Sequence, residues 1–214
     1  MEKREGHPRA RYRVRGVAAA SLLAGAAIFA AAAWAQDSDI PFATVKLDGG
    51  ASMDVPAMIA DQVKPGKDAP KDVMMFFNIS AGDPGTLSCE LKRDGYDKDN
   101  PRETLEKSLS NDEARKFCKV DRPGVSDFQL GSAIAAKSDG LPGASCLSAF
   151  TDSSQQAQGR VLTVEAVAGK KNFYQLVCIN AFDDKDGAVA AYAMRWSPIV
   201  TRAQKSLHLA ADEK

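Results

Sequence analysis

The stretch Arg160–Phe182, RVLTVEAVAGKKNFYQLVCINAF, decides the fold of this 214-residue chain. Residues 160–168 and 172–181 are rich in β-branched and aromatic side chains, a composition that is typical of strands. Only the short polar segment GKKN separates the two runs. Because a connection this short joins antiparallel neighbours, the stretch predicts a β-hairpin.

Two more strands are predicted upstream, near residues 128–136 and 144–151. The connections SDGLPG and DSSQQAQG are again short, so the four strands form a meander. An earlier hairpin is predicted where the apolar run Val73–Ser80 and the alternating run Thr86–Leu91 flank the turn AGDPG. Phe42–Leu47 is predicted as a further short strand. The chain is therefore dominated by antiparallel β-structure.

Helices are predicted on both sides of the meander. Asn100-Pro101 supplies a cap and a proline for the first helical position, and a capping box at Ser110 predicts a break before the helix resumes. The segment Gly187–Leu209 repeats apolar residues at spacings of three and four, with a kink or restart at Pro198. Helices that cover the apolar faces of an antiparallel sheet define an α+β fold.

The N-terminus has the three parts of a secretory signal peptide. Basic residues mark the first 15 positions, residues 17–33 are all apolar or small, and Ala33-Trp34-Ala35 places small residues where signal peptidase cleaves. We expect Sec-type export to the bacterial periplasm or beyond, cleavage after Ala35, and a single domain over residues 36–214. The alternative is an uncleaved anchor, for which 17–33 is just short of the usual spanning length.

Removal of residues 1–35 changes the charge of the chain. The full sequence has 28 basic and 28 acidic residues, and the removed segment takes six basic and two acidic residues with it. The remaining 179 residues carry 22 basic and 26 acidic side chains, a net charge of −4. This balance gives no argument for nucleic-acid binding. Membrane contact is expected only through an uncleaved signal segment, because no second apolar run is long enough to span a bilayer.

All four cysteines, Cys89, Cys118, Cys146 and Cys178, lie after residue 35. An even count in an oxidising compartment predicts two disulfides with one of three connectivities. A helix that returns alongside its strand favours Cys89–Cys118, which leaves Cys146 with Cys178. Those two would lie two strand spacings of ~4.8 Å apart, whereas a disulfide needs Cα atoms within ~7 Å. Either the order of the meander differs from the predicted one or the pairs are crossed, as Cys89–Cys178 with Cys118–Cys146 or as Cys89–Cys146 with Cys118–Cys178. The connectivity therefore stays open.

No catalytic set is evident. Ser145 and Cys146 follow a Gly-Leu-Pro-Gly turn, but Leu147 stands where the G-x-S-x-G pattern of a nucleophile elbow needs its final glycine. Such nucleophiles usually need a histidine base, and His208 is the one histidine after residue 35. We interpret His208 as a surface residue in the last turn of the closing helix, where it complements the helix dipole. Cys146 is interpreted as disulfide-bonded, and no enzymatic activity is expected.

Two acidic loops are candidate calcium sites. They are formed by Asp94, Asp97 and Asp99, and by Asp183, Asp184 and Asp186. Neither has the spacing of an EF-hand, so we interpret both as solvated turns. A single histidine cannot build a histidine-rich zinc or copper site. No metal and no cofactor are expected.

Three short features mark the second half of the chain: a turn into a strand, an aromatic pair in a hairpin strand, and a pair that closes the last helix. They are Gly140-Leu141-Pro142, Phe173-Tyr174 and Ser206-Leu207. With the order of the elements, they make residues 41–209 resemble the PsbP-like fold, which includes extrinsic photosystem II subunits and many small exported bacterial proteins. The resemblance implies an α/β/α sandwich and a non-enzymatic accessory or binding role. It brings no catalytic residues.

The leading hypothesis is an exported periplasmic binding or accessory module of the cell envelope, whose partner is an envelope protein or a ligand. One alternative is a small exported hydrolase whose carboxylates or serine meet only in three dimensions, which would gather perturbed carboxylates in a pocket. A further alternative is a structural envelope protein, which predicts a tight oligomer. Fold alone does not decide between these hypotheses.

Overall fold

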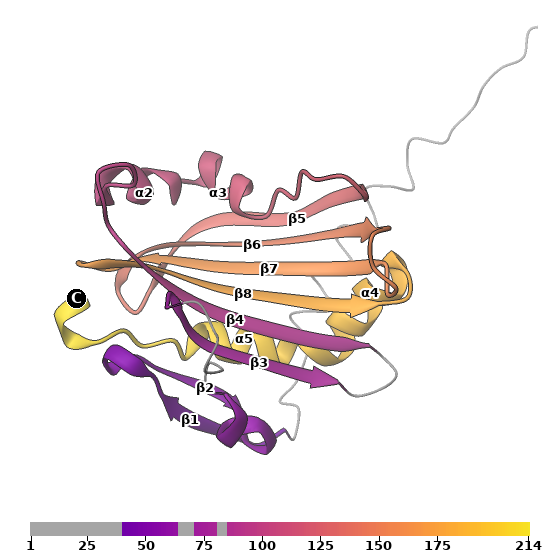
Figure 1. The fold of residues 1–214 in the computed structure, drawn as a ribbon, viewed down its shortest axis with the longest axis horizontal. Coiled ribbons are helices and arrows are strands. Elements are labelled where there is room, and N and C mark those ends of the chain that lie inside the picture. The colour runs from indigo at the N-terminus through magenta and orange to yellow at the C-terminus, as the bar shows by residue number, and fades with distance from the viewer. Residues whose placement is uncertain (1–39, 64–70, 81–84) are drawn as a thin grey trace, which may run out of the picture.

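The computed structural model describes residues 40–63, 71–80 and 85–214 (Figure 1). The predicted signal peptide, residues 1–35, and its cleavage after Ala35 lie outside the described residues. Within the described ranges, no helix is long and apolar enough to cross a membrane.

A six-stranded antiparallel sheet forms the centre of the fold (Figure 1). In spatial order its strands are β3 (Val73–Ser80), β4 (Thr86–Gly95), β8 (Asn172–Phe182), β7 (Gly159–Ala168), β6 (Leu141–Asp152) and β5 (Val125–Ser138). The predicted hairpin (β3–β4) and the predicted meander (β5–β8) are confirmed. Their junction is the pairing of β4 with β8, which adds the first hairpin to the end of the meander.

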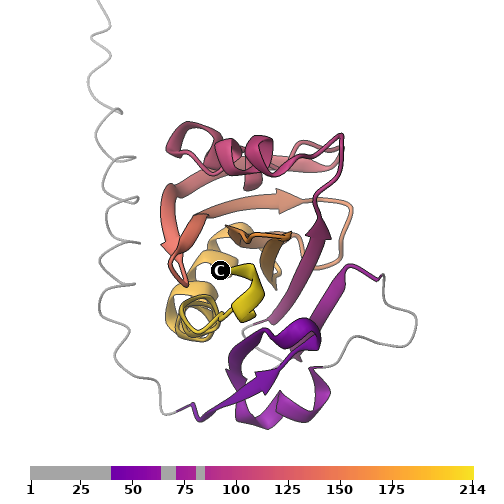
Figure 2. The same ribbon diagram turned by 90° about the vertical axis from the view of Figure 1, so that its left-hand side faces the viewer.

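The helices divide between the two faces of this sheet (Figure 2). They are α2 (Arg102–Ser108), α3 (Asn111–Phe117), α4 (Lys185–Ala191), the π-helical turn η3 (Tyr192–Trp196), α5 (Ser197–Lys205) and the short η4 (Ala211–Glu213). The break at Ser110 and the restart at Pro198 are confirmed. The predicted cap at Asn100 is wrong by one residue, since Pro101 precedes the first helical residue.

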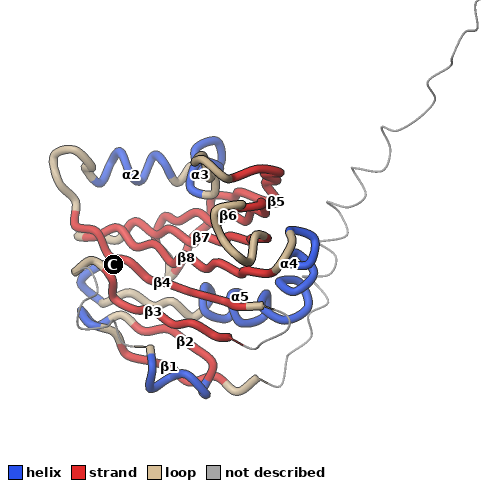
Figure 3. Tube along the Cα trace, turned by 45° about the vertical axis from the view of Figure 1, so that its right-hand side comes forward, coloured by secondary structure: helices blue, strands red, loops and turns tan. Residues whose placement is uncertain are grey.

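A separate two-stranded sheet lies beside β3 and α5 (Figure 3). It consists of β1 (Phe42–Lys46), the turn η1 (Asp48–Gly50) and β2 (Ser52–Pro56), followed by η2 (Ala57–Gln62). Gly49 has a φ of 78°, a left-handed conformation that suits glycine. Asp54 of β2 accepts hydrogen bonds of 2.7 Å from Thr44 Oγ1 and from Arg202 Nε, which fasten the hairpin to α5.

The two faces of the large sheet have cores of different size. The face under η3 and α5 holds the main apolar core, in which Trp196 and Val200 are fully buried against residues of β3, β4 and β8. The opposite face holds smaller clusters beneath α2 and α3, centred on Leu109 and Phe173 and on Phe150. The chain is therefore an α+β protein with helices on both sides of an antiparallel sheet, as predicted.

Each face carries one disulfide. Cys89 of β4 and Cys178 of β8 are direct register partners and are bonded, and Cys118 at the end of α3 is bonded to Cys146 of β6. The pairing of Cys89 with Cys118 and of Cys146 with Cys178 is wrong. The reason is that β7 separates β6 from β8, and that α3 covers β5 and β6 rather than β4. One of the two crossed connectivities is thus confirmed.

The chain ends in an extended segment rather than in helix. His208 donates its backbone N–H to Ser52 O (2.9 Å) and accepts from Ser52 N (2.8 Å), so it pairs with the start of β2. The prediction that His208 occupies the last helical turn is wrong, because α5 ends at Lys205. Its Nδ1 lies 3.3 Å from Asp139 Oδ1 in the β5–β6 turn, and Leu209 N donates to the same carboxylate at 2.9 Å.

Candidate functional site

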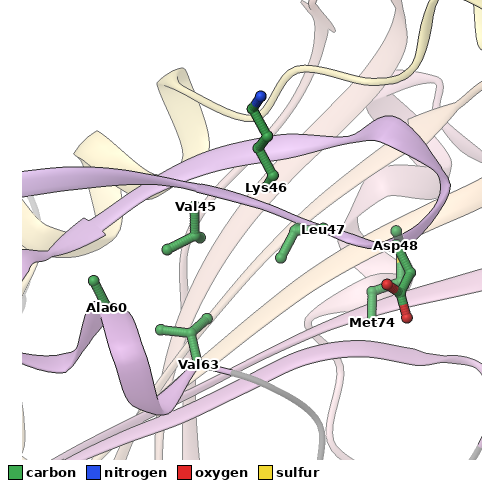
Figure 4. Close-up of a pocket in the computed structure, with 7 residues that line it drawn as sticks. All are labelled: Val45, Lys46, Leu47, Asp48, Ala60, Val63 and Met74. Atoms are coloured by element: carbon green, nitrogen blue, oxygen red, sulfur yellow. The ribbon is translucent and has the colours of Figure 1, made fainter.

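A pocket lies between the small sheet, η2 and the start of β3 (Figure 4). Its volume is about 410 Å³. It is lined by Val45, Lys46, Leu47, Asp48, Ala60, Val63 and Met74. Ligand pockets in proteins typically have volumes of roughly 300–1,000 Å³ and mostly apolar walls. The volume falls within that range, and five of the seven lining residues are apolar.

The local backbone explains why the walls are apolar. Successive side chains of a strand point to opposite sides, so Val45 and Leu47 face one way and Lys46 the other. Figure 4 shows Val45 and Leu47 directed toward Ala60 and Val63, with Lys46 pointing away from them. The pocket is therefore a slot between β1 and η2, with apolar groups on both sides.

Met74 and Asp48 form one end of the slot (Figure 4). Met74 is the extra residue of a β-bulge, since the register of β3 with β4 shifts between Val73 and Met75. A bulge re-aims a side chain, and here it places a thioether that adapts to irregular spaces against the slot. Met74 and Val63 are buried and also belong to the main core, so the floor of the pocket is continuous with that core.

The charges around the slot are unequal. The carboxylate of Asp48 stands at the Met74 end, whereas the ammonium of Lys46 extends away from the apolar residues (Figure 4). The guanidinium of Arg93 lies against Gly49, because a Cβ at Gly49 would be 2.3 Å from Arg93 Nη1. Among the described residues, however, neither Lys46 nor Arg93 forms an ion pair with Asp48 within 4.0 Å.

The sequence candidates for catalysis lie elsewhere. Ser145 is half-buried on β6, and Cys146 forms a disulfide with Cys118. His208 is at the surface beside Asp139, not beside Ser145. The side chain directly opposite Ser145 on β7 is Glu165, and the two lie on one face of the sheet. The structure therefore brings a hydroxyl next to a carboxyl, without the histidine.

Glu165 is a buried acid that the sequence analysis did not single out. Only 8% of the residue is exposed, and burial raises the pKa of its carboxyl to about 7, opposed by a hydrogen bond from Ser138. At a pKa of about 7 the carboxyl is roughly half ionised at neutral pH, a range that suits a general base. Glu165 is buried, however, and does not line the pocket between β1 and η2. The signal in the sequence was a lone acidic residue inside the apolar run VLTVEAVA.

A second buried acid, Glu213, has the opposite surroundings. Its carboxylate accepts hydrogen bonds from Lys171 N (2.8 Å), Tyr174 Oη (3.1 Å) and the amide group of Asn172. Burial alone would raise the pKa of Glu213, but these hydrogen bonds outweigh it and hold the pKa below its ordinary value. Glu213 therefore acts as the C-terminal anchor on the β7–β8 turn.

The two acidic loops serve local structure. Asp97 accepts hydrogen bonds from Asp99 N (2.9 Å) and Asn100 N (2.7 Å), which shape the turn before α2. Asp184 precedes α4 and accepts from Gly187 N at 2.7 Å, as a helix N-cap does. In the parts of the chain that the structure describes, no three His, Cys, Asp or Glu residues are grouped so as to hold a metal ion.

No family model matches the chain, and no curated protein matches it. Among solved structures, the chain is similar to PsbP of the cyanobacterium Synechocystis, with 12% identity, a TM-score of 0.48 and coverage of 83% of this chain and 99% of that one. A mutant of the protein Mog1 has 12% identity, a TM-score of 0.49 and coverages of 79% and 96%. LpqN of Mycobacterium tuberculosis, involved in cell envelope biogenesis, has 13% identity, a TM-score of 0.37 and coverages of 80% and 91%.

The predicted PsbP-like resemblance has counterparts among these solved structures, whose TM-scores of 0.48 and 0.49 mark a distant likeness. At identities of 12 to 13% it is a likeness of chain path and carries nothing about ligand or partner. The two disulfides are, independently, typical of proteins that fold outside the cytoplasm.

Proposed function

We propose that this chain is an exported, non-enzymatic binding module whose slot between β1 and η2 receives an apolar group of its ligand or partner. The observation that supports it is the pocket itself: about 410 Å³, walled by side chains such as Val45, Leu47 and Val63, and with no serine, cysteine or histidine among its described lining residues. Contact with apolar walls is non-directional and scales with the buried area. A pocket of this kind suits binding better than bond cleavage.

The proposed location is the periplasm, reached by Sec-type export with cleavage after Ala35. The signal-peptide pattern and the two disulfides support it. Expression of the full chain in a Gram-negative host, followed by intact-mass measurement of the periplasmic fraction, tests it. The expected product begins at Gln36 and carries two disulfides. A cytoplasmic product that retains residues 1–35 would contradict the proposal.

The pocket is tested with a neutral fluorescent probe, N-phenyl-1-naphthylamine, on the protein spanning residues 36–214. We expect saturable binding at one site. The variant Ala60→Phe fills the slot and should abolish binding. Ala57→Phe is the matched control, because Ala57 belongs to the same η2 turn, is exposed and does not line the pocket. Equal binding by both variants, or no binding by the wild type, would contradict the proposal.

The partner is sought by cross-linking the tagged protein in its own cell envelope and identifying the products by mass spectrometry. A reproducible, stoichiometric envelope partner that is captured by wild type and Ala57→Phe but not by Ala60→Phe supports a binding role through the slot. Capture that is unaffected by Ala60→Phe would show that the partner uses another surface. The same preparations should show no hydrolysis of ester, phosphate or glycoside substrates above the level of a Ser145→Ala variant.

A further inference from the structure

We infer that the slot selects an aliphatic chain that carries a cationic head, such as an alkylammonium amphiphile. The inference rests on the proposed binding function and adds the chemical class of the ligand. It is carried by the position of Asp48 at one end of a slot whose other lining residues are Lys46 and five apolar residues (Figure 4).

The apolar part of the ligand is defined by the two walls. Val45 and Leu47 on β1 face Ala60 and Val63 across the slot, and none of these four side chains offers a hydrogen bond. A polar chain would lose its hydration there without compensation, so an alkyl chain is favoured. The slot runs toward Met74, whose flexible thioether accommodates methylene groups.

The head group is defined by charge. Among the described residues, Asp48 forms no ion pair with any lysine, arginine or histidine, although Arg93 lies against its neighbour Gly49. Asp48 is exposed, so its attraction for a cation is that of a surface pair, at most about 1 kcal/mol or about fivefold in affinity. The same carboxylate repels an anionic head. Lys46 also belongs to the lining, but its ammonium extends away from Val45 and Leu47, so Asp48 is the charged group at the Met74 end.

Competition against the naphthylamine probe separates the head groups. Octyltrimethylammonium, octanol and octanoate share one alkyl chain and differ in charge. At low ionic strength the expected order of affinity is cation, then alcohol, then anion. The variant Asp48→Asn should weaken the cation about fivefold, leave the alcohol unchanged and bring the three ligands together. Asp61→Asn is the matched control, since Asp61 is an exposed acid of η2 outside the lining.

These outcomes separate a failure of the inferred ligand class from a failure of the proposed binding function. If octanol displaces the probe but octanoate binds as well as the cation, or if Asp48→Asn changes nothing, the inference is wrong and the binding function stands. If none of the three ligands displaces the probe and the probe itself does not bind, both are wrong. A cation preference that 0.5 M salt removes, and that Asp61→Asn leaves intact, establishes the role of Asp48.

Discussion

The two faces of the central sheet are built from the same strands but are stabilised differently. On the face under α5, the packing is continuous from β3 and β4 to Trp196 and Val200. On the face under α2 and α3, the apolar clusters are smaller, and part of the sheet carries exposed apolar side chains such as Phe76 and Ile179. The helices α2 and α3 have seven residues each, too short to be stable alone.

This difference in apolar packing between the two faces indicates that the two disulfides have different roles. Cys89 and Cys178 join strands that the backbone already pairs, inside the larger core. Cys118–Cys146 instead attaches the end of α3 to β6, where the apolar clusters are smaller than the main core. We therefore expect the first disulfide to act on the whole fold, and the second to act mainly on the attachment of α2 and α3.

Removal of the Cys89–Cys178 disulfide by a double change to serine should lower the free energy of unfolding by about 4 to 5 kcal/mol. The two residues are 89 positions apart, so the cross-link closes a long loop in the unfolded chain. Denaturant titration of residues 36–214, followed through the fluorescence of Trp196, measures the loss. If the free energy of unfolding falls less than it does on removal of Cys118–Cys146, the proposed difference between the two disulfides is wrong.

Phe77 and Phe76 are adjacent residues on opposite faces of β3, with 2% and 44% exposure. Phe77→Ala removes a ring from the main core and should cost about 4 kcal/mol, whereas Phe76→Ala should cost about 0.5 kcal/mol. The pair forms its own control, because strand, composition and size of the change are the same. Similar losses measured by denaturant titration would mean that the α2–α3 face also buries Phe76 in solution.

Removal of the Cys118–Cys146 disulfide by a double change to serine should cost about 3 to 4 kcal/mol, because its loop spans 28 positions. Hydrogen exchange should show which segments lose protection when this disulfide is removed. We expect protection to decrease first in residues 102–117, with the β4–β8 pairing retained at low denaturant. A uniform loss of protection over the whole sheet would show that this disulfide is as global as the first one.

Glu165→Gln should stabilise the protein above pH 7 by about 3 kcal/mol. The carboxyl has an ordinary pKa of 4.5 and a folded-state pKa of about 7. Between these values the unfolded chain is ionised while the folded chain holds the proton, so wild-type stability falls as the pH rises through this window. The glutamine variant lacks this fall, and the two proteins should be equally stable near pH 4.

Denaturant titrations at pH 4, 6 and 8 measure the effect. Glu103→Gln, a change at an exposed glutamate of α2, is the control and should show no such pH-dependent gain. If the difference between wild type and Glu165→Gln is the same at all three pH values, the buried carboxyl is not protonated in the folded state. Water or a cation would then reach it at the β6–β7 interior.

Much of the fold was predictable because it depends on local patterns. The apolar run VMMFFNIS became β3 with the predicted bounds, and the short turns around Arg160–Phe182 required antiparallel neighbours. The restart at Pro198 followed from the ring of proline, which suits the first turn of a helix. The candidate pocket was not predictable, because Val45, Ala60 and Met74 come from three elements with no shared motif.

The sequence alone predicted β1, the six strands of the large sheet, the positions of most helices and an even set of cysteines, because these depend on nearby residues. It did not predict β2 or the end of α5 at Lys205. Only the tertiary structure decided that β4 lies beside β8, and this pairing sets the disulfide between Cys89 and Cys178. It also decided that His208 lies beyond the helix and pairs with Ser52, and that Glu165 is buried with a hydrogen bond from Ser138. These features depend on contacts between residues far apart in the chain, whose geometry no local pattern encodes.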